Sequence, residues 1–264
     1  MKVLSKLFAC LVVVLATTWT SAVFAQSVND LIASGKIRIG VNSAAPPFSF
    51  IGTSGKVDGY DVEVGRKIAE FLGVEAEFVA YPTAGRIPAL ESDKIDIAIA
   101  TLTPTPARAK VVMFTIPYVT FGSSIISAKD SAINSLEDLA GKKVGVARGT
   151  PQEVKLTDEG PKGMDIARFD DDAITMQALV AGQVDAIAVP DTIFIEFAKS
   201  RPGHSFDFKF SLQNFFMSVA VRKDAFELQQ WLNTVISFMK VTGDLTQLYE
   251  KWVGKPLPAI MPEF

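Results

Sequence analysis

The distribution of apolar and polar positions along the first half of the chain alternates between two periods. Short apolar runs that fit buried strands are separated by longer segments in which apolar residues recur at helical spacing. The predicted strands cover residues 37–41, 76–81 and 95–100, and the predicted helices cover residues 61–72 and 86–92. This strand, helix, strand, helix, strand order predicts an α/β fold with a mainly parallel sheet between layers of helices.

The second half of the chain repeats part of this pattern. Residues 86–100 are echoed by residues 175–189, and both contain an Ala-Leu pair, a polar turn, an Ile-Asp or Val-Asp pair and an apolar strand. Residues 35–47 are echoed by residues 141–153, because each is a strand that reaches Gly-Val and continues into a polar loop. One such pair could arise in any helix-turn-strand unit, but two pairs in the same order favour two similar lobes.

The two predicted lobes are connected by two chain crossings. The first crossing is predicted near residues 120–124 and the second near residues 213–217. Two crossings indicate a hinge, and ligands of such sheets bind beyond the carboxyl ends of the strands. The predicted division is residues 26–121 with 216–264 for lobe one and residues 122–215 for lobe two.

Residues 1–25 have the features of a secretory signal peptide. Two lysines precede an apolar run, and small residues follow up to Ala25. The apolar run is shorter than the roughly 20 residues that a membrane-spanning helix needs, so we expect an exported, soluble mature chain. A lipoprotein leader through Cys10 is less favoured, because this cysteine lies inside the apolar run.

The charge and the scarcity of metal ligands narrow the possible functions. The formal net charge is −3, which becomes −5 once the two lysines of the leader are removed. Binders of nucleic acid or anionic membranes usually carry basic patches, so this balance argues against both partners. Because Cys10 leaves with the leader and His204 is the single histidine, we expect no metal site and no cofactor.

The loop after the predicted strand 95–100 carries a candidate anion receptor. Thr105 and Pro106 resemble the N-cap and first position of a helix, which would put Arg108 in its first turn. A cation there is disfavoured by about 0.3 to 1 kcal/mol, so we expect an anion to visit this corner. The hydroxyl of Thr103 and the Arg108 guanidinium are both donors and suit a carboxylate. The alternative for Arg108 is a surface salt bridge.

Lobe two supplies two further candidates at the ends of its strands. Thr150 in "GTPQE" fits a helix N-cap with Glu153 reaching back, and a purely structural cap is the alternative to a ligand contact. Asp191 follows the apolar run "DAIAVP" and could either cap the next helix or accept from an ammonium group. An arginine and threonines opposite an aspartate are complementary to a zwitterion such as an α-amino acid.

Six segments together resemble the periplasmic solute-binding proteins of polar amino acid ABC transporters, the extracellular solute-binding family 3. They are "IRIGVNSAAPPFSF", "VDGYDVEVGRKIAEFLG", "RIPALESDKIDIAIATLTPTPARAKVVMFTIPY", "LEDLAGKKVGVARGTPQE", "LVAGQVDAIAVPD" and "LTQLYEKWVG". The resemblance implies a two-lobed type II periplasmic-binding-protein fold that closes on a polar amino acid and delivers it to a membrane permease. It also implies a periplasmic location and action as a monomer.

The resemblance assigns roles to the cleft residues. Arg108 would bind the α-carboxylate with help from Thr103 and Thr150, and Asp191 would bind the α-ammonium group with polar atoms near Thr101. Such a protein catalyses no reaction. An enzyme on the same scaffold, a cyclohexadienyl-type dehydratase, is the alternative, with Glu153 or Asp191 as its general acid.

The residues expected to contact the ligand side chain differ from the common pattern of the family. Arg86 could meet a second ligand carboxylate, or it could pair with Glu91 or Asp93 on its own helix. Ala45 and Thr83 stand where relatives often carry an aromatic and a bulky apolar residue. This thinner apolar lining, with Thr83 as a ligand contact, predicts a larger ligand or one contacted through water.

One acidic and three aromatic positions near the start of lobe one are assigned structural roles. Asp61, which follows Gly59 and Tyr60, is expected to cap the helix over residues 61–72. Phe48, Phe50 and Tyr60 are expected to pack mostly in the core of lobe one.

Overall fold

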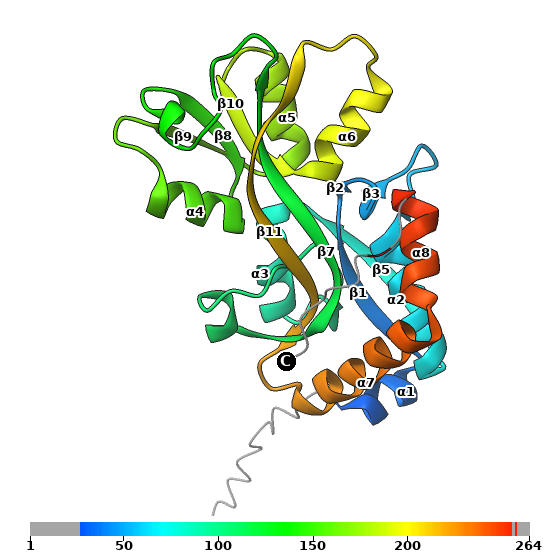
Figure 1. Cartoon of the computed structure of the whole chain (residues 1–264). Helices are drawn as coiled ribbons and strands as arrows, with labels where there is room; N and C mark the ends of the chain where they lie inside the picture. Colours follow the sequence, from blue (N-terminus) through cyan, green and yellow to red (C-terminus); the bar gives the residue numbers. More distant parts are fainter. Residues whose placement is uncertain (1–26, 255–256, 258–264) are drawn as a thin grey trace, which may run out of the picture.

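The structure is a computed structural model that describes residues 27–254 and Leu257. One eight-stranded sheet with the order β5-β1-β6-β11-β7-β10-β8-β9 runs through the described chain (Figure 1). Its strands are β1 (Lys36–Asn42), β5 (Glu75–Tyr81), β6 (Ile97–Ala98), β7 (Val112–Ala128), β8 (Lys143–Ala147), β9 (Asp165–Phe169), β10 (Ala186–Pro190) and β11 (Phe206–Arg222). A small second sheet contains β2 (Ala44–Ala45), β3 (Ser49–Ile51) and β4 (Val57–Asp58).

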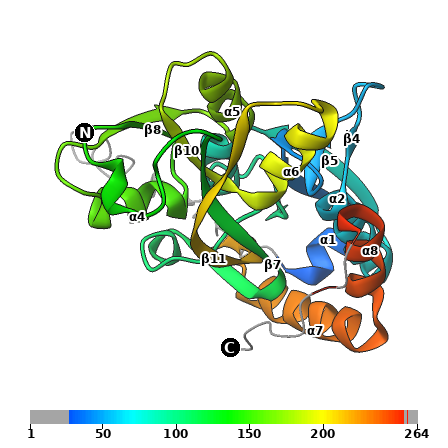
Figure 2. The same ribbon diagram turned by 45° about the horizontal axis from the view of Figure 1, so that its top comes forward.

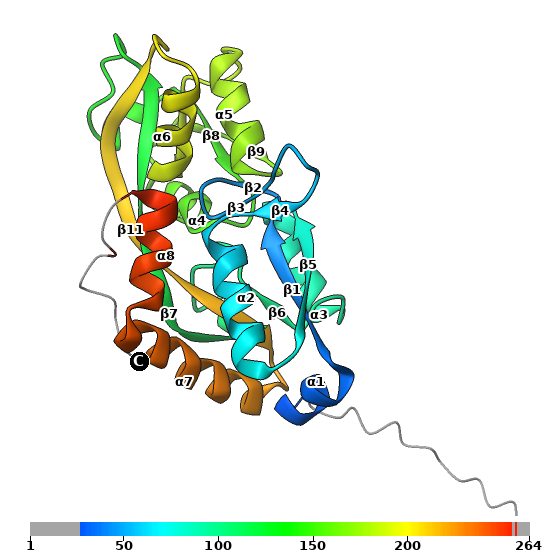
Figure 3. The ribbon, with the colours of Figure 1, turned by 90° about the vertical axis from the view of Figure 1, so that its right-hand side faces the viewer.

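Helices cover the sheet in both lobes. They are α1 (Val28–Ser34), α2 (Tyr60–Leu72), α3 (Arg86–Glu91), α4 (Pro151–Glu159), α5 (Asp172–Val180), α6 (Asp191–Ser200), α7 (Phe226–Thr242) and α8 (Asp244–Val253). Short 3₁₀ turns occur at Thr83–Gly85, Arg108–Lys110 and Glu137–Leu139. In Figure 3, α5, α6, β8 and β9 form one lobe above, and α1, α2, α7, α8 and β1 belong to the other lobe below. The predicted two-lobed α/β fold is confirmed.

Two long antiparallel strands, β7 and β11, connect the lobes and lie side by side in Figures 1 and 2. Strand β7 pairs with β10 only from Ser123 onward, and β11 pairs with β6 only at Ala220 and Val221. Between these points the described sheet is only two strands wide. The predicted crossings near residues 120–124 and 213–217 are thus found in β7 and β11, whereas the exact lobe boundaries stay a prediction.

Lobe one is built around a parallel set of three strands. Strand β1 pairs in parallel with β5 on one side and with β6 on the other. Helix α2 packs on this sheet because Val64, Ile68 and Leu72 recur every four residues and are buried. It ends at Gly73, whose left-handed φ of 75° is open to glycine without strain.

Lobe two repeats this arrangement with a different set of connections. Strand β8 pairs in parallel with both β9 and β10, and β10 then pairs antiparallel with β7. Apolar side chains from both faces of these strands form two buried clusters, one of which includes Ala45 of lobe one. The loop that contains β2 therefore packs against lobe two.

The repeated Ile-Asp and Val-Asp pairs have the same structural role in the two lobes. The Asp96 carboxylate accepts the backbone N–H of Arg38 in β1 at 2.6 Å, and the Asp185 carboxylate accepts the backbone N–H of Lys143 in β8 at 2.7 Å. In both cases the aspartate N–H also donates to the carbonyl of the same strand residue, at 2.8 Å. The internal repeat predicted from the sequence therefore corresponds to a repeated strand contact.

The predicted strand over residues 95–100 is shorter than expected. Only Ile97 and Ala98 have strand geometry, because Asp96 binds β1 through its side chain and Thr101 turns the chain with a φ of 52°. The predicted signal peptide, residues 1–25, lies outside the described residues. Among the residues that the structure describes, no helix is long and apolar enough to cross a membrane.

We expect Asp96→Ala to destabilise the protein more than Asp185→Ala. Asp96 is 3% exposed and also pairs with the Arg38 guanidinium at 2.6 Å, so its loss removes the buried partner of Arg38, leaves this arginine only the exposed Asp93, and should cost about 3 kcal/mol. Asp185 is exposed and its loss should cost about 1 kcal/mol. Urea unfolding of both variants, with Asp165→Ala on exposed β9 as the control, measures the difference. A loss for Asp96→Ala no larger than that of the control would contradict this explanation.

Candidate functional site

Three of the predicted site residues form one hydrogen-bonded cluster at the carboxyl ends of the lobe-one strands. The amide Nδ2 of Asn42, the last residue of β1, donates to the hydroxyl of Thr83 at 3.1 Å and to that of Thr101 at 3.5 Å. The Nη1 atom of Arg86 donates to the Thr101 hydroxyl at 3.0 Å. Asn42 was not singled out from the sequence, although its place at a strand end pointed to the cleft.

Arg86 is buried in this cluster, with 3% of its surface exposed. Its Nε donates to the carbonyl of Thr83 at 2.8 Å, and its Nη1 also donates to the carbonyls of Ala100 and Thr101. Burial lowers the pKa of Arg86 to about 10, and nearby carboxylates oppose that change. The alternative of a pair with Glu91 or Asp93 is wrong, because the guanidinium instead donates to the carbonyls of Thr83, Ala100 and Thr101.

Asp93 is occupied elsewhere. Its carboxylate pairs with Arg38 and Arg222 at the far end of the lobe-one strands. Since α3 begins at Arg86, the side chain of this first helical residue reaches back over the strand ends and not along the helix surface.

Thr101 is held in an unusual backbone conformation by a buried carboxylate. Its φ of 52° lies in the left-handed region, which costs free energy for a threonine. Its N–H donates to Oδ2 of Asp61 at 3.1 Å, and the Tyr118 hydroxyl donates to Oδ1 of Asp61 at 2.8 Å. Burial raises the pKa of Asp61 to about 7, while these two hydrogen bonds oppose the rise.

The prediction that Asp61 caps α2 is wrong. Gly59 is the N-cap residue, and Asp61 lies inside the first turn with its side chain directed to the Thr101 loop. No direct sequence signal pointed to this contact, because Asp61 and Thr101 are 40 positions apart. As predicted, Phe48 and Tyr60 are buried in the lobe-one core, whereas Phe50 is only half-buried and packs edge-on against Trp252 of α8 instead.

Arg108 lies in a short turn and not in the first turn of a helix. A 3₁₀ turn covers Arg108–Lys110, and β7 starts at Val112, so the β-branched and aromatic residues of that strand leave no room for a helix. Thr105 still caps the turn by accepting the N–H of Arg108 at 3.2 Å. The prediction of a helix after Thr105 is therefore wrong, and no helix dipole acts on Arg108.

The Arg108 guanidinium joins the two lobes. Its Nη1 donates to the Thr103 carbonyl at 2.7 Å, and its Nη2 donates to the Gly149 carbonyl in lobe two. Burial lowers the pKa of Arg108 to about 9, and the positive charge of Arg86 lowers it further. Two arginines thus lie close enough in this cleft to repel each other.

The hydroxyl groups of Thr103 and Thr150 differ in their hydrogen bonding. Thr103 is 7% exposed, and its Oγ1 makes no hydrogen bond within the described residues. The Thr150 hydroxyl is fully used, because it donates to the Ala147 carbonyl at 2.7 Å and accepts the Glu153 N–H at 3.2 Å. Glu153 reaches back to the N–H of Gly149 at 2.6 Å and not to that of Thr150. Thr150 is thus the predicted N-cap of α4, and its backbone N–H makes no hydrogen bond within the described residues.

Asp191 lies at the junction of lobe two and the crossing strands. It is the first residue of α6, and Pro190 is the N-cap residue, so the expectation of Asp191 as a side-chain cap is wrong. A methyl group on Gly122 of β7 would lie 2.2 Å from Oδ2 of Asp191. The carboxylate therefore occupies the space that this glycine leaves open on the hinge strand.

A further buried carboxylate, Asp172, was not predicted as part of the site. It is the first residue of α5 and is 5% exposed. Burial raises its pKa to about 7, and the charge of Arg86 opposes this rise. Its neighbour Asp171 caps α5, so the sequence suggested only helix-start carboxylates at this point.

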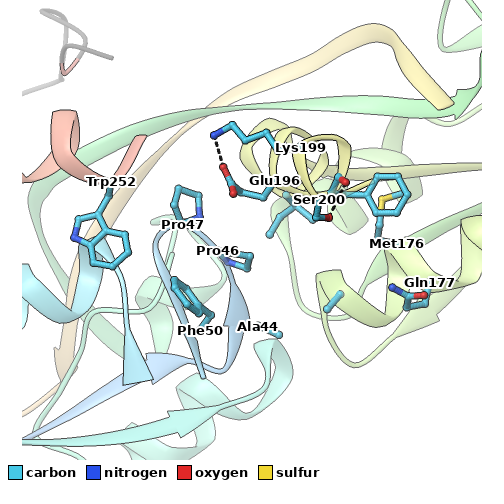
Figure 4. A pocket seen from close by; sticks show the side chains of 13 residues that line it. Ala44, Pro46, Pro47, Phe50, Met176, Gln177, Glu196, Lys199, Ser200 and Trp252 are labelled. Atoms are coloured by element: carbon cyan, nitrogen blue, oxygen red, sulfur yellow. Dashed lines mark hydrogen bonds and ion pairs between the residues drawn. The ribbon is translucent and has the colours of Figure 1, made fainter. Parts of the chain in front are cut away.

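A groove of about 520 Å³ lies between the lobes outside this set of residues. Figure 4 shows it between Pro46, Pro47 and Phe50 of lobe one, Trp252 of α8, and the residues Met176, Gln177 and Glu196 of α5 and α6. None of the predicted site residues lines this groove. A second groove of about 490 Å³ is lined by Thr103 and by residues of α4 and β11, and so borders the site.

Named proteins with amino acid ligands are similar to most of this chain. The L-cystine-binding protein TcyJ of Escherichia coli (strain K12) is 33% identical over 234 residues, which cover 86% of this chain and 85% of the relative. The L-arginine-binding protein of Pseudomonas aeruginosa is 30% identical and covers 90% of this chain and 95% of the relative.

Solved structures give the same result for the fold. The solute receptor for L-cysteine of Neisseria gonorrhoeae has a TM-score of 0.81 and 32% identity, covering 86% of this chain and 94% of that one. The ancestral amino acid-binding protein AncCDT-1, described as a precursor of cyclohexadienyl dehydratase, has a TM-score of 0.76 and 34% identity, covering 85% and 98%. The fold is thus that of type II periplasmic binding proteins.

The family model of the bacterial extracellular solute-binding proteins, family 3, matches residues 37–255. This match covers all residues of the cluster described above, from Asn42 to Asp191. The chain belongs to the bacterial extracellular solute-binding proteins, family 3.

Proposed function

We propose that this protein captures a polar α-amino acid in the cleft between its lobes and delivers it to the permease of an ABC transporter. The observation that carries the proposal is the pairing of Arg108 and the unpartnered Thr103 hydroxyl on one lobe with Asp191 at the edge of the other. These groups complement the two charges of a zwitterion. Relatives that are named for the binding of cystine, arginine and histidine support it.

The α-carboxylate would bind at Arg108 and Thr103. A buried hydroxyl without a partner is costly, and a carboxylate oxygen at hydrogen-bond distance from Thr103 Oγ1 would remove that cost. The guanidinium lies beside it and can offer charge-assisted hydrogen bonds to the same carboxylate. The backbone N–H of Thr150, at the start of α4, would supply a donor from lobe two.

The α-ammonium group would bind at Asp191, close to the crossing strands. Because Asp191 lies against Gly122 of β7, its position depends on the hinge as well as on α6. A ligand bound between Arg108 and Asp191 therefore contacts both lobes, and its contacts would be complete only in the closed arrangement. Such contacts shift the equilibrium between open and closed forms toward the closed one.

The hinge would be the two-strand part of the sheet, with lobe boundaries at residues 121/122 and 215/216. This region carries no third strand among the described residues, so bending it breaks few hydrogen bonds. Register irregularities in β11 lie at Ser211/Gln213, at one edge of this region, and at Met217/Ser218 within it. Such irregularities are typical of places where strands bend.

We further propose that the protein catalyses no reaction, acts as a monomer and works in the periplasm. Glu153, the alternative general acid, accepts the N–H of Gly149 and pairs with Arg168 at 2.5 Å, so its carboxylate is fixed in a structural role. The dehydratase precursor among the similar structures is itself described as an amino acid-binding protein. The predicted signal peptide and the periplasmic histidine-binding relatives support the location.

We expect Arg108→Ala and Asp191→Ala each to weaken amino acid binding by about 100-fold or more, because truncating one partner of a buried charge pair costs 2 to 5 kcal/mol. Calorimetric titration of refolded, ligand-free protein measures the loss. Arg148→Ala is the matched control, since Arg148 is an exposed arginine beside Gly149 that pairs with Asp170 and donates to the Arg168 carbonyl. Near wild-type affinity in either site variant would remove that residue from the site.

The ligand for this titration comes from a thermal-shift screen against the twenty L-amino acids and prephenate. A ligand at about 100 times its Kd should raise the free energy of unfolding by about 2.7 kcal/mol. Recovery of the bound amino acid unchanged is the expected result. Turnover of prephenate would instead establish the dehydratase alternative.

We expect Gly122→Ala to weaken amino acid binding by about tenfold or more without unfolding the protein, because the new methyl group would displace the Asp191 carboxylate. The control is Gly52→Ala, where a methyl group would lie 3.4 Å from its nearest neighbour, an ordinary contact. Calorimetry gives the affinity and circular dichroism gives the melting temperature. An unchanged affinity for Gly122→Ala would separate Asp191 from ligand binding.

A further inference from the structure

The loop over residues 101–103 positions two of the proposed contacts for the ligand carboxylate. The Thr103 carbonyl accepts from the Arg108 guanidinium at 2.7 Å, and the Thr103 hydroxyl is buried with no hydrogen-bond partner within the described residues. Thr101 begins this loop with a φ of 52°, a region that is unfavourable for a β-branched residue. Because Thr103 follows closely in the chain, a change of φ at Thr101 would move both contacts.

Hydrogen bonds hold the strained loop from three sides. The Thr101 N–H donates to Oδ2 of Asp61 at 3.1 Å, and the Thr101 hydroxyl accepts from Arg86 Nη1 at 3.0 Å. The next carbonyl, that of Leu102, accepts the N–H of Ser218 in β11 at 2.9 Å. Backbone strain of this kind persists only where the surroundings over-determine it, and it is common at ligand sites.

An irregularity in the ladder between the two crossing strands lies beside this loop. The pairing of β7 with β11 passes over Tyr118, which is therefore an extra residue on β7. The flanking pairs are Pro117 with Ser218 and Val119 with Met217. This point is in the two-strand part of the sheet, the proposed hinge, and extra residues bend a strand and re-aim its side chains.

The Asp61 carboxylate bridges this extra residue and the loop. Its Oδ1 accepts the Tyr118 hydroxyl at 2.8 Å, while its Oδ2 accepts the Thr101 N–H. Asp61 is 0% exposed and lies in the first turn of α2, and Tyr118 stacks on Tyr60 in the lobe-one core. One buried side chain thus connects the hinge strand to the strained residue of the cleft.

We propose that Asp61 is a positioning residue of the ligand site, which couples the bending of β7 at Tyr118 to the backbone conformation of Thr101. The loop over residues 101–103 then presents its carboxylate contacts when the lobes close. This inference rests on the proposed function, in which Thr103 and Arg108 bind the α-carboxylate. Asp61 acts through Thr101 and does not itself bind the ligand.

Two other roles of Asp61 lead to different results. A carboxylate with a purely structural role would change the stability of the protein and not its affinity for a ligand. A carboxylate that acted only through its charge on Arg86 would oppose capture of an anionic group, so its loss would strengthen binding of the ligand carboxylate. The positioning role instead requires weaker binding when Asp61 or its bond to Tyr118 is lost.

Tyr118→Phe tests the bond to the hinge strand and keeps the aromatic ring. The probe is whichever of the twenty L-amino acids and L-cystine raises the melting temperature of ligand-free wild-type protein most. We expect Tyr118→Phe to weaken binding of this probe by about tenfold in calorimetric titrations.

Tyr60→Phe is the matched control. Tyr60 is equally buried, and its hydroxyl donates to the Tyr118 carbonyl at 3.2 Å, so this bond to the same residue bypasses Asp61. The control should keep an affinity within about twofold of the wild type. Each variant loses one buried hydrogen bond, so both should melt about 2 to 4 °C lower by circular dichroism.

A rescue experiment separates positioning from general stability. Glycine adopts a φ near 52° without strain, so a loop with Thr101→Gly depends less on Asp61. Asp61→Asn, which offers one acceptor oxygen in place of two, should weaken binding by about tenfold with Thr101 present and by no more than about threefold in the Thr101→Gly background. Thr101→Val is the control background, because it also lacks the hydroxyl but keeps the β-branched strain and should give no rescue.

Three results would overturn the positioning role. They are equal losses of affinity in Tyr118→Phe and Tyr60→Phe, unchanged or stronger binding by Asp61→Asn, and an effect of Asp61→Asn that is the same in the glycine and valine backgrounds. If Asp61→Asn fails to fold, Tyr118→Phe replaces it in the same rescue experiment. If Arg108→Ala abolishes binding while these variants do not weaken it, only the positioning role fails. If no probe binds the wild-type protein, the proposed function fails as well.

Discussion

The antiparallel ladder between β7 and β11 is the interaction on which the rest of the molecule depends. It carries the sheet from one lobe to the other and is the only part of the described sheet that is two strands wide. Parallel strands β1 and β6 end on one side of it, and β8 and β10 end on the other. Because ligand sites form at such strand ends, the ladder brings the polar ends of both lobes to a common cleft.

The chemistry of the cleft follows from two arginines whose charged form is disfavoured by burial. Arg86 and Arg108 both have lowered pKa values, and each arginine is held mainly by backbone carbonyls, which orient it without neutralising its charge. Asp61 compensates Arg86 from a distance while it holds Thr101 in place. The remaining positive charge is best compensated by an anion that enters the cleft, which is why a carboxylate ligand fits this site.

How much could be predicted from sequence depended on whether the signal was local. Apolar periodicity located the helices and strands, and Arg108 and Asp191 stood out because each follows an apolar strand that ends at a turn. The prediction of a helix after Thr105 was wrong because the helix-start preference of Thr105 and Pro106 was outweighed by the strand preference of the β-branched and aromatic residues from Val112.

The contacts that a sequence cannot show are those made through space between distant segments. Asp61 and Asp172 both stand at helix starts, where an acidic residue normally has a local role, so nothing marked them as cleft residues. The direction of Arg86 was likewise open, since a helix-start arginine can turn outward or back over the strand ends. Tertiary packing determined where the side chains of Asp61, Asp172 and Arg86 lie, and all three contribute to the charge of the cleft.

The hydrogen bond between Arg108 and Gly149 bears on how closure can depend on a ligand. It links the lobes without a ligand, so the guanidinium is not left wholly unpaired when the cleft is shut. A ligand shifts the equilibrium only through contacts that differ between the open and closed forms. The Thr103 hydroxyl is buried and makes no hydrogen bond within the described residues, and opening of the lobes would return it to water. Burial of this hydroxyl opposes closure, and a ligand that binds it converts this cost into its preference for the closed form.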